Sequence, residues 1–139
     1  MQTSFKILLL TILLSCAIRK ANSQIIYSVP TDTSIQFIKV SLDSLLNNIS
    51  KFENGIWIEF DGEIVFGEEA FAIFSKKPIT NKARTYPAIW LGGSQLQIDI
   101  SKINHQYCKV RGWLNKEKHG HSGWYYATIE DIRLIKKIN

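Results

Sequence analysis

Three histidine side chains are the groups in this chain best suited to hold a metal ion. His119 and His121 flank Gly120 in a glycine-rich stretch, and His105 lies shortly before it. Because neutral imidazole is a good ligand for zinc or copper, one hypothesis is a metal-dependent hydrolase or nuclease that uses His119 and His121. No cysteine or clear carboxylate partner stands at ligand spacing, and such a pair also serves to shape a loop by hydrogen bonds to the backbone. We therefore expect no bound metal and no cofactor.

Aromatic and basic side chains surround the same stretch. Arg111 and Trp113 precede it, and Trp124-Tyr125-Tyr126 follows it. Such a mixture is typical of surfaces that stack nucleic-acid bases, and aromatic faces also bind sugars or peptides; the alternative is that Trp124 and one tyrosine fill the interior. We expect a ligand to stack on Trp113 or Trp124 and to be oriented by Arg111 and His121. The predicted binding residues are Arg111, Trp113, His121, Trp124 and Tyr125.

Acidic side chains form a third group. Glu59, Asp61 and Glu63 alternate along one predicted strand. Paired carboxylates can bind a metal or act as acid and base, but no nucleophile or complementary base accompanies them. We expect a solvated strand face that pairs with Lys109 and Arg111 on a neighbouring strand and that repels phosphate.

Alternation of apolar and polar residues indicates the elements that must position these groups. Cys108, Val110, Gly112 and Leu114 share one apolar face, which is typical of a half-buried strand. Cys108 is therefore predicted to be a buried, unreactive thiol. Similar patterns predict five strands in all, at residues 56–66, 70–75, 88–91, 108–114 and 124–135.

Local features add detail to this pattern. The first strand is long, and Gly62 at its centre predicts a bend or bulge. A shift in apolar parity between Ile129 and Ile132 predicts a second bulge near residues 130–131. Ser41 is the predicted N-cap of a helix whose apolar stripe is formed by Leu42, Leu45, Leu46 and Ile49 and which ends by residues 54–55. Residues 101–107 are expected to form a helical turn.

These elements predict an all-β fold with one N-terminal helix. Five strands, the first long and bent at a glycine, match a Greek-key barrel of the oligonucleotide/oligosaccharide-binding (OB) type. The chain offers little room for a full helix between the third and fourth strands, so a complete and an incomplete barrel both stay open.

The chain resembles a group of small exported bacterial proteins with an OB-like fold and uncharacterised function. The matching pieces are the helix start at 41–46, Val110-Arg111-Gly112 in the fourth strand, and the loop Gly120-His121-Ser122-Gly123-Trp124. The resemblance covers residues 39–135. It implies an OB-like fold and carries no established activity.

The N-terminus predicts export. Lys6 is followed by an uncharged apolar run that ends at Ile18, which is shorter than the roughly 20 apolar residues needed to span a bilayer. This is the pattern of a secretory signal peptide, with cleavage predicted between Ser23 and Gln24. The predicted division is a signal peptide (1–23), an extended lead (24–39) and the barrel domain (40–139). The alternatives are a retained membrane anchor, or a lipoprotein tethered through Cys16.

Removal of the predicted signal peptide changes the charge of the chain. The whole sequence has 17 Lys and Arg against 12 Asp and Glu, a net charge of +5, whereas residues 24–139 carry only +2. That is a weak basis for nucleic-acid binding. Cys108 would be the one remaining cysteine, so no intrachain disulfide is expected. The sequence favours a periplasmic or secreted non-enzymatic binding module whose partner is a glycan or another envelope protein. A single-stranded nucleic-acid binder stays as an alternative, by analogy of fold alone.

Overall fold

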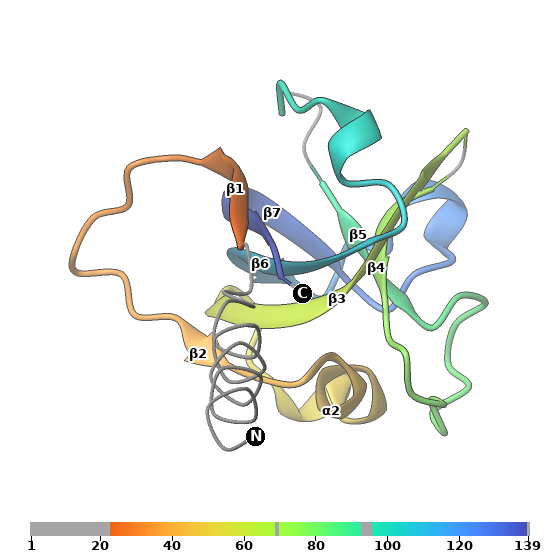
Figure 1. Cartoon of the computed structure of the whole chain (residues 1–139). Helices are drawn as coiled ribbons and strands as arrows, with labels where there is room; N and C mark the ends of the chain where they lie inside the picture. The colour runs from red at the N-terminus through yellow and green to blue at the C-terminus, as the bar shows by residue number, and fades with distance from the viewer. Residues whose placement is uncertain (1–22, 69, 93–95, 139) are drawn as a thin grey trace, which may run out of the picture.

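The computed structural model describes residues 23–68, 70–92 and 96–138, and within them the chain is mostly β (Figure 1). In this described part of the chain, seven strands form one sheet, with one short α-helix and three 3₁₀ turns. The predicted apolar run of the signal peptide and Cys16 lie outside the described residues. In chain order the elements are β1 (Gln24–Ser28), β2 (Ile38–Lys39), α2 (Leu42–Asn47), η1 (Ile49–Lys51), β3 (Trp57–Gly67), β4 (Ala70–Phe74), β5 (Ala88–Leu91), η2 (Ile100–Lys102), β6 (Gln106–Asn115), η3 (His121–Gly123) and β7 (Thr128–Lys137).

All five predicted strands are present as β3 to β7, and one of them starts later than expected. The fifth begins at Thr128 instead of residue 124. Trp124 has right-handed helical backbone angles (φ −85°, ψ −12°) at the end of η3, so it cannot continue an extended strand. The helical turn expected at 101–107 is a single 3₁₀ turn, because β6 already begins at Gln106.

The extended lead belongs to the sheet. β1 pairs antiparallel with β7, from Gln24 opposite Lys137 to Ser28 opposite Leu134. Figure 1 shows β1 lying beside β7 near the C-terminus. β2 pairs in parallel with the start of β3, with Lys39 opposite Glu59.

The remaining strand pairings start at β3 and lead back to it. β3 pairs antiparallel with β4, and β4 with β5. β5 then pairs in parallel with β7, and β6 pairs antiparallel with both β7 and β3. Apolar side chains on the inner faces of these strands form the main core, which includes Ile58, Phe60, Ile64, Ile73, Ile89, Leu91, Val110, Leu114, Ile129 and Ile135.

Helix α2 packs on this core as its apolar stripe predicts. Leu42, Leu45 and Leu46 are buried, and Ser41 precedes the helix in an extended conformation. The helix ends at Asn47, earlier than expected, and η1 follows it. The Asn47 side-chain oxygen accepts hydrogen bonds from the backbone N–H groups of residues 80 and 81. The end of the helix is thereby fixed to the β4–β5 connection. None of the helices in the described part of the chain is long and apolar enough to cross a membrane.

The two irregularities predicted for the strands have different outcomes. The β3–β6 register runs through Gly62, opposite Cys108, without a shift, so the pairing shows no bulge there. A methyl group added at Gly62 would come 2.8 Å from Leu42 Cδ2 and 2.7 Å from Ile73 Cγ1, so the glycine allows the helix and β4 to approach β3. The predicted bulge in β7 is confirmed. Arg111 lies opposite Leu134, but Trp113 lies opposite Glu130. The extra β7 residues between these pairs include Asp131, whose φ is +45°.

Candidate ligand-binding site

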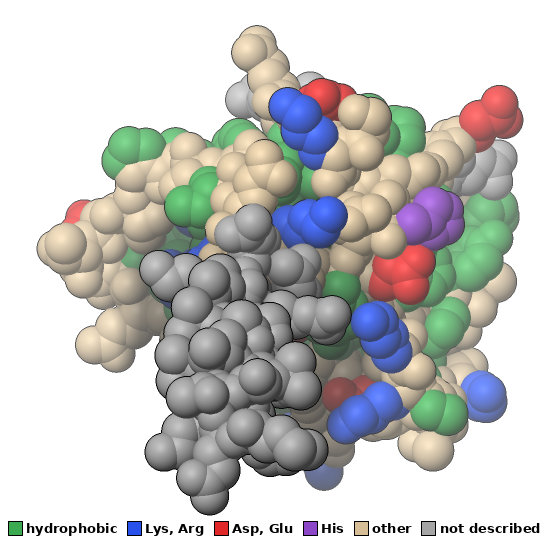
Figure 2. Space-filling model, in the orientation of Figure 1, with side chains coloured by type: hydrophobic (Ala, Val, Ile, Leu, Met, Phe, Trp, Pro, Cys, Tyr) green, Lys and Arg blue, Asp and Glu red, His purple; other side chains and the backbone are tan. Residues whose placement is uncertain are grey.

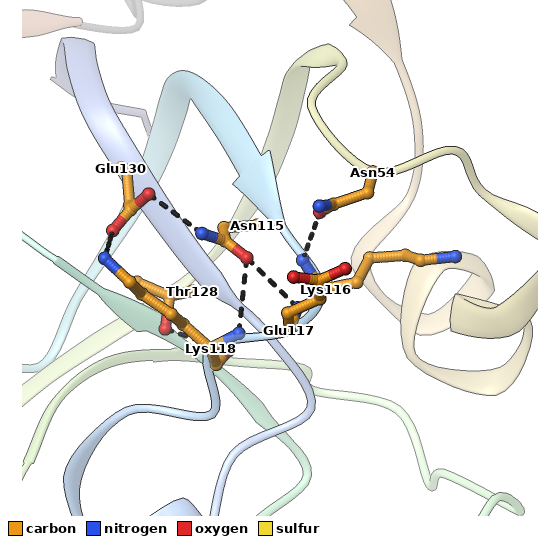
Figure 3. Close-up of polar contacts among 7 residues, drawn as sticks. All are labelled: Asn54, Asn115, Lys116, Glu117, Lys118, Thr128 and Glu130. Carbon is orange, nitrogen blue, oxygen red and sulfur yellow. Dashed lines mark hydrogen bonds and ion pairs between the residues drawn. The ribbon is translucent and has the colours of Figure 1, made fainter.

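The loop between β6 and β7, residues 116–127, is held in shape at its base by polar contacts (Figure 3). Asn115 Oδ1 accepts hydrogen bonds from the N–H groups of Glu117 (3.0 Å) and Lys118 (3.3 Å). Its Nδ2 donates to Glu130 Oε2 at 3.0 Å. The first residues of the loop therefore turn back over the strand from which they emerge.

Further contacts attach this base to both sides. Asn54 Oδ1 accepts a hydrogen bond from the Lys116 N–H at 2.7 Å, and Thr128 Oγ1 donates to the Lys118 carbonyl at 3.1 Å. The Lys118 ammonium group pairs with Glu130. Hydrogen bonds from Asn115 and Lys118 hold the pKa of Glu130 below its usual value, so the carboxylate stays charged at neutral pH.

Aromatic rings gather where this loop meets β4, β5 and the connection between them. Tyr86 lies at the centre, with its ring centroid 5.6 Å from that of Trp124, 5.4 Å from Tyr125 and 6.4 Å from Phe74. Tyr125 also packs on Trp90 at 5.0 Å, and the His121 ring meets Trp124 edge to face at 6.0 Å. We call this set the ring cluster; it consists of Phe74, Tyr86, Trp90, His121, Trp124 and Tyr125.

Small residues on the outer face of the sheet make room for these rings. Ala72 lies opposite Trp90, and Ala88 lies opposite Phe74. Gly120 has a φ of +64°, and a methyl group there would come 2.7 Å from Trp90 Cβ. Both the conformation and the close approach require glycine at this position.

The ring cluster has a buried base and an exposed rim. Tyr125 is completely buried, whereas Tyr86 retains 37% exposure and His121 is exposed. Trp124 is half-buried between them. A ligand can therefore reach Tyr86, Trp124 and His121 without displacing the core.

The predicted binding residues do not form a single group. His121, Trp124 and Tyr125 meet in the ring cluster. Arg111 instead donates from Nε to Glu59 Oε2 at 2.5 Å, and its guanidinium lies 5.2 Å from the centre of the Phe37 ring. Trp113 is paired across the sheet with residues of β3 and β7, opposite Trp57 and Glu130.

The acidic strand face differs from its prediction in one respect. The expected pairing is confirmed, because Lys109 Nζ lies 2.8 Å from Glu59 Oε1 and 3.4 Å from Asp61 Oδ1. The expected solvation is wrong for Glu59, which is only 3% exposed. The Glu59 carboxylate lies between Lys109 and Arg111, and β2 pairs with this part of β3, with Lys39 opposite Glu59.

The three histidines occupy separate places. His105 Nδ1 lies 3.1 Å from Glu63 Oε1, His121 packs on Trp124, and His119 lines a cavity beside Tyr126. Within residues 23–68, 70–92 and 96–138, no three His, Cys, Asp or Glu side chains gather closely enough to hold a metal ion.

Cys108 is buried on the inner face of β6, as its parity predicts. Burial raises the pKa of its thiol to about 11, so little reactive thiolate is present at neutral pH.

The sequence interpretation missed the residues that β4, β5 and their connection contribute. Phe74, Tyr86, Trp90 and Arg84 were not assigned to the site, although Arg84 Nη1 donates to the Gly123 carbonyl at 3.2 Å. The sequence carried a signal of them. In β4 and β5 the outward-facing positions are filled by aromatic residues and alanines, and they alternate with core residues.

Comparisons with family models, curated proteins and solved structures found no match for this chain.

Proposed function

We propose that this chain is an exported, non-enzymatic binding module with an OB-like barrel, and that its ligand is a glycan. The strand pairings support the barrel. The pairings form a circuit of five strands, β3–β4–β5–β7–β6–β3, with one parallel step between β5 and β7, and this strand order is compatible with the five-stranded, partly open Greek-key barrel of an OB fold. β1 and β2 are additions to that circuit.

The ring cluster is the observation that carries the proposed function. It lies on the outer faces of β4 and β5 next to the β6–β7 loop, and OB barrels bind oligosaccharides and oligonucleotides on this face and with the loop in this position. Tyr86 and Trp124 offer aromatic surface to solvent, which suits the apolar face of a sugar ring. The buried Tyr125 packs against Tyr86 and in turn against Trp90.

Charge favours a glycan over a nucleic acid. On the face in view in Figure 2, Lys and Arg side chains are interspersed with Asp and Glu. Nucleic-acid binding draws most of its affinity from a basic surface that neutralises phosphates. The net charge of +2 on residues 24–139 offers little of this.

The test compares two tryptophan variants by amide NMR with a pool of oligosaccharide fragments. We expect saturable shifts at residues 84–90 and 119–126, and we expect Trp124→Ala to abolish them while Trp113→Ala leaves them in place. Unchanged thermal melting and unchanged amide shifts elsewhere establish that each variant is folded. Binding lost in Trp113→Ala but retained in Trp124→Ala would move the site to the β3–β6 face and refute this proposal.

Export is tested separately by the mass of the protein recovered from the envelope or medium of a producing bacterium. A chain that begins at Gln24 supports cleavage after Ser23. A lipid-modified chain that begins at Cys16 would support the lipoprotein alternative instead.

A further inference from the structure

An open cavity of about 210 Å³ lies next to the ring cluster, where η1, the β4–β5 connection and the β6–β7 loop meet. Its walls include Ser50, Arg84, Lys116, His119 and Tyr126. Arg84 belongs to both places, because it lines the cavity and also binds the Gly123 carbonyl directly before Trp124.

Hydrogen bonds fasten the three segments around this cavity. The Lys116 ammonium group donates to the carbonyls of Ser50, at 3.5 Å, and Phe52. The Tyr126 hydroxyl donates to the Asn81 carbonyl. The cavity is therefore a built feature of the fold, and its basic side chains are already held in position.

The charge of the cavity is unbalanced. Arg84, Lys116 and His119 line it, and none of its lining residues is acidic. None of these three side chains takes part in an ion pair with another described residue, whereas the neighbouring Lys118 is paired with Glu130. An anion would supply the missing charge.

We propose that this cavity binds a phosphate oxyanion. The Arg84 guanidinium matches phosphate geometry and keeps free N–H donors after its bond to Gly123. Lys116 adds a positive charge that its hydrogen bonds to the Ser50 and Phe52 carbonyls hold in place. This inference deepens the proposed function. If the phosphate is carried by a sugar, the sugar would lie beside Trp124, and that part of the inference rests on the proposed function.

The test is an amide NMR titration of the full chain with inorganic phosphate, at constant ionic strength maintained with chloride. We expect saturable shifts confined to residues 49–50, 83–84, 116–119 and 126. Arg84→Gln should weaken phosphate binding about tenfold. Lys82→Gln is the matched control, because it removes the same charge from the same connection at a residue that does not line the cavity, and it should leave the affinity unchanged.

Two results would overturn the proposal. One is the absence of saturable shifts at the cavity. The other is equal weakening by Arg84→Gln and Lys82→Gln, which would mean general attraction of anions to a positive surface. Lys116→Gln gives a second check that does not depend on Arg84, because Lys116 also lines the cavity, and retained affinity in a folded variant would likewise contradict the proposal.

A parallel titration with glucose 6-phosphate distinguishes a carried phosphate from the free ion. Additional shifts of the Trp124 indole with the sugar phosphate would support a phosphorylated glycan as the ligand. Cavity shifts with inorganic phosphate, but no shift of the ring cluster with any glycan, would refute the proposed function and leave the phosphate site standing. Shifts of the ring cluster with a glycan, but no shifts at the cavity with phosphate, would refute the phosphate site and leave the proposed function standing.

Discussion

Glu59 shows how one side chain depends on its surroundings. Its carboxylate is buried between Lys109 and Arg111, which are themselves partly exposed. Burial alone would raise the pKa of Glu59, but hydrogen bonds from the two cations outweigh it and hold the pKa below the usual 4.5.

We predict that Glu59→Gln lowers the free energy of unfolding by about 1–2 kcal/mol at neutral pH, because it leaves two partly exposed cations without their anion. Since the folded-state pKa is depressed, the contribution of Glu59 is complete above the unfolded value and is lost as the pH falls through the folded-state pKa. Urea unfolding at several pH values should therefore show that the difference in free energy of unfolding between wild type and variant decreases below about pH 4.5. Glu53→Gln, at an exposed site, should change stability by less than about 0.5 kcal/mol.

At this scale the sequence could predict the pairing of Glu59 but not its burial. Alternation places Glu59 on the outer face of β3, and outer faces are normally wet. Its burial depends on residues distant in the chain that pack around it, such as Lys109 and Arg111, and no local pattern encodes that packing. In the same way, Trp113 and Trp124 have equivalent aromatic character in the sequence, and only the fold separates their surroundings.

At the scale of the secondary-structure elements, β6 leaves no room for a side chain at one position that faces β7. A methyl group added at Gly112 would lie 2.2 Å from Ile129 Cγ2 and 3.1 Å from the Glu130 carbonyl oxygen. The backbone oxygen cannot turn away as a flexible side chain could. Gly112 is therefore required for these two strands to pair on either side of the bulge.

We predict that Gly112→Ala lowers the free energy of unfolding by about 2 kcal/mol, through overpacking and displacement of β7. Gly67→Ala is the matched control at the end of β3, because a methyl group there meets nothing within 4 Å, and it should be close to neutral. Chemical unfolding of both variants measures the difference. Equal stability of the two would show that β7 adjusts freely at the bulge.

The elements that sequence could predict are those with their own periodicity. β3 and β6 alternate over ten residues or more, and even the bulge in β7 left a trace as a change of parity. β1 and β2 have no such signal, since each is short and is defined by a partner far away in the chain. The break at Trp124 follows from the packing of the β6–β7 loop on β5, which no local pattern encodes.

On the scale of the whole molecule, β1 completes the sheet along the C-terminal half of β7. Ile26 and Tyr27 pack against the main core, and β1 covers one edge of β7 between Leu134 and Lys137. We predict that a chain beginning at Val29 is less stable than one beginning at Gln24 by at least about 2 kcal/mol, from lost apolar burial.

The same truncation should also promote association, because it leaves the edge of β7 unpaired. Thermal melting and sedimentation of the two chains at matched concentrations measure both effects. A monomeric chain from Val29 with unchanged melting would show that β1 is dispensable.

The pairing of β1 with β7 also imposes an order in time. During synthesis β1 leaves the ribosome first, and its partner follows more than a hundred residues later. Until then β1 has no place in the sheet, and β3 likewise waits for β6. Such distant contacts slow folding. The sheet therefore cannot close until nearly all of the chain has been made.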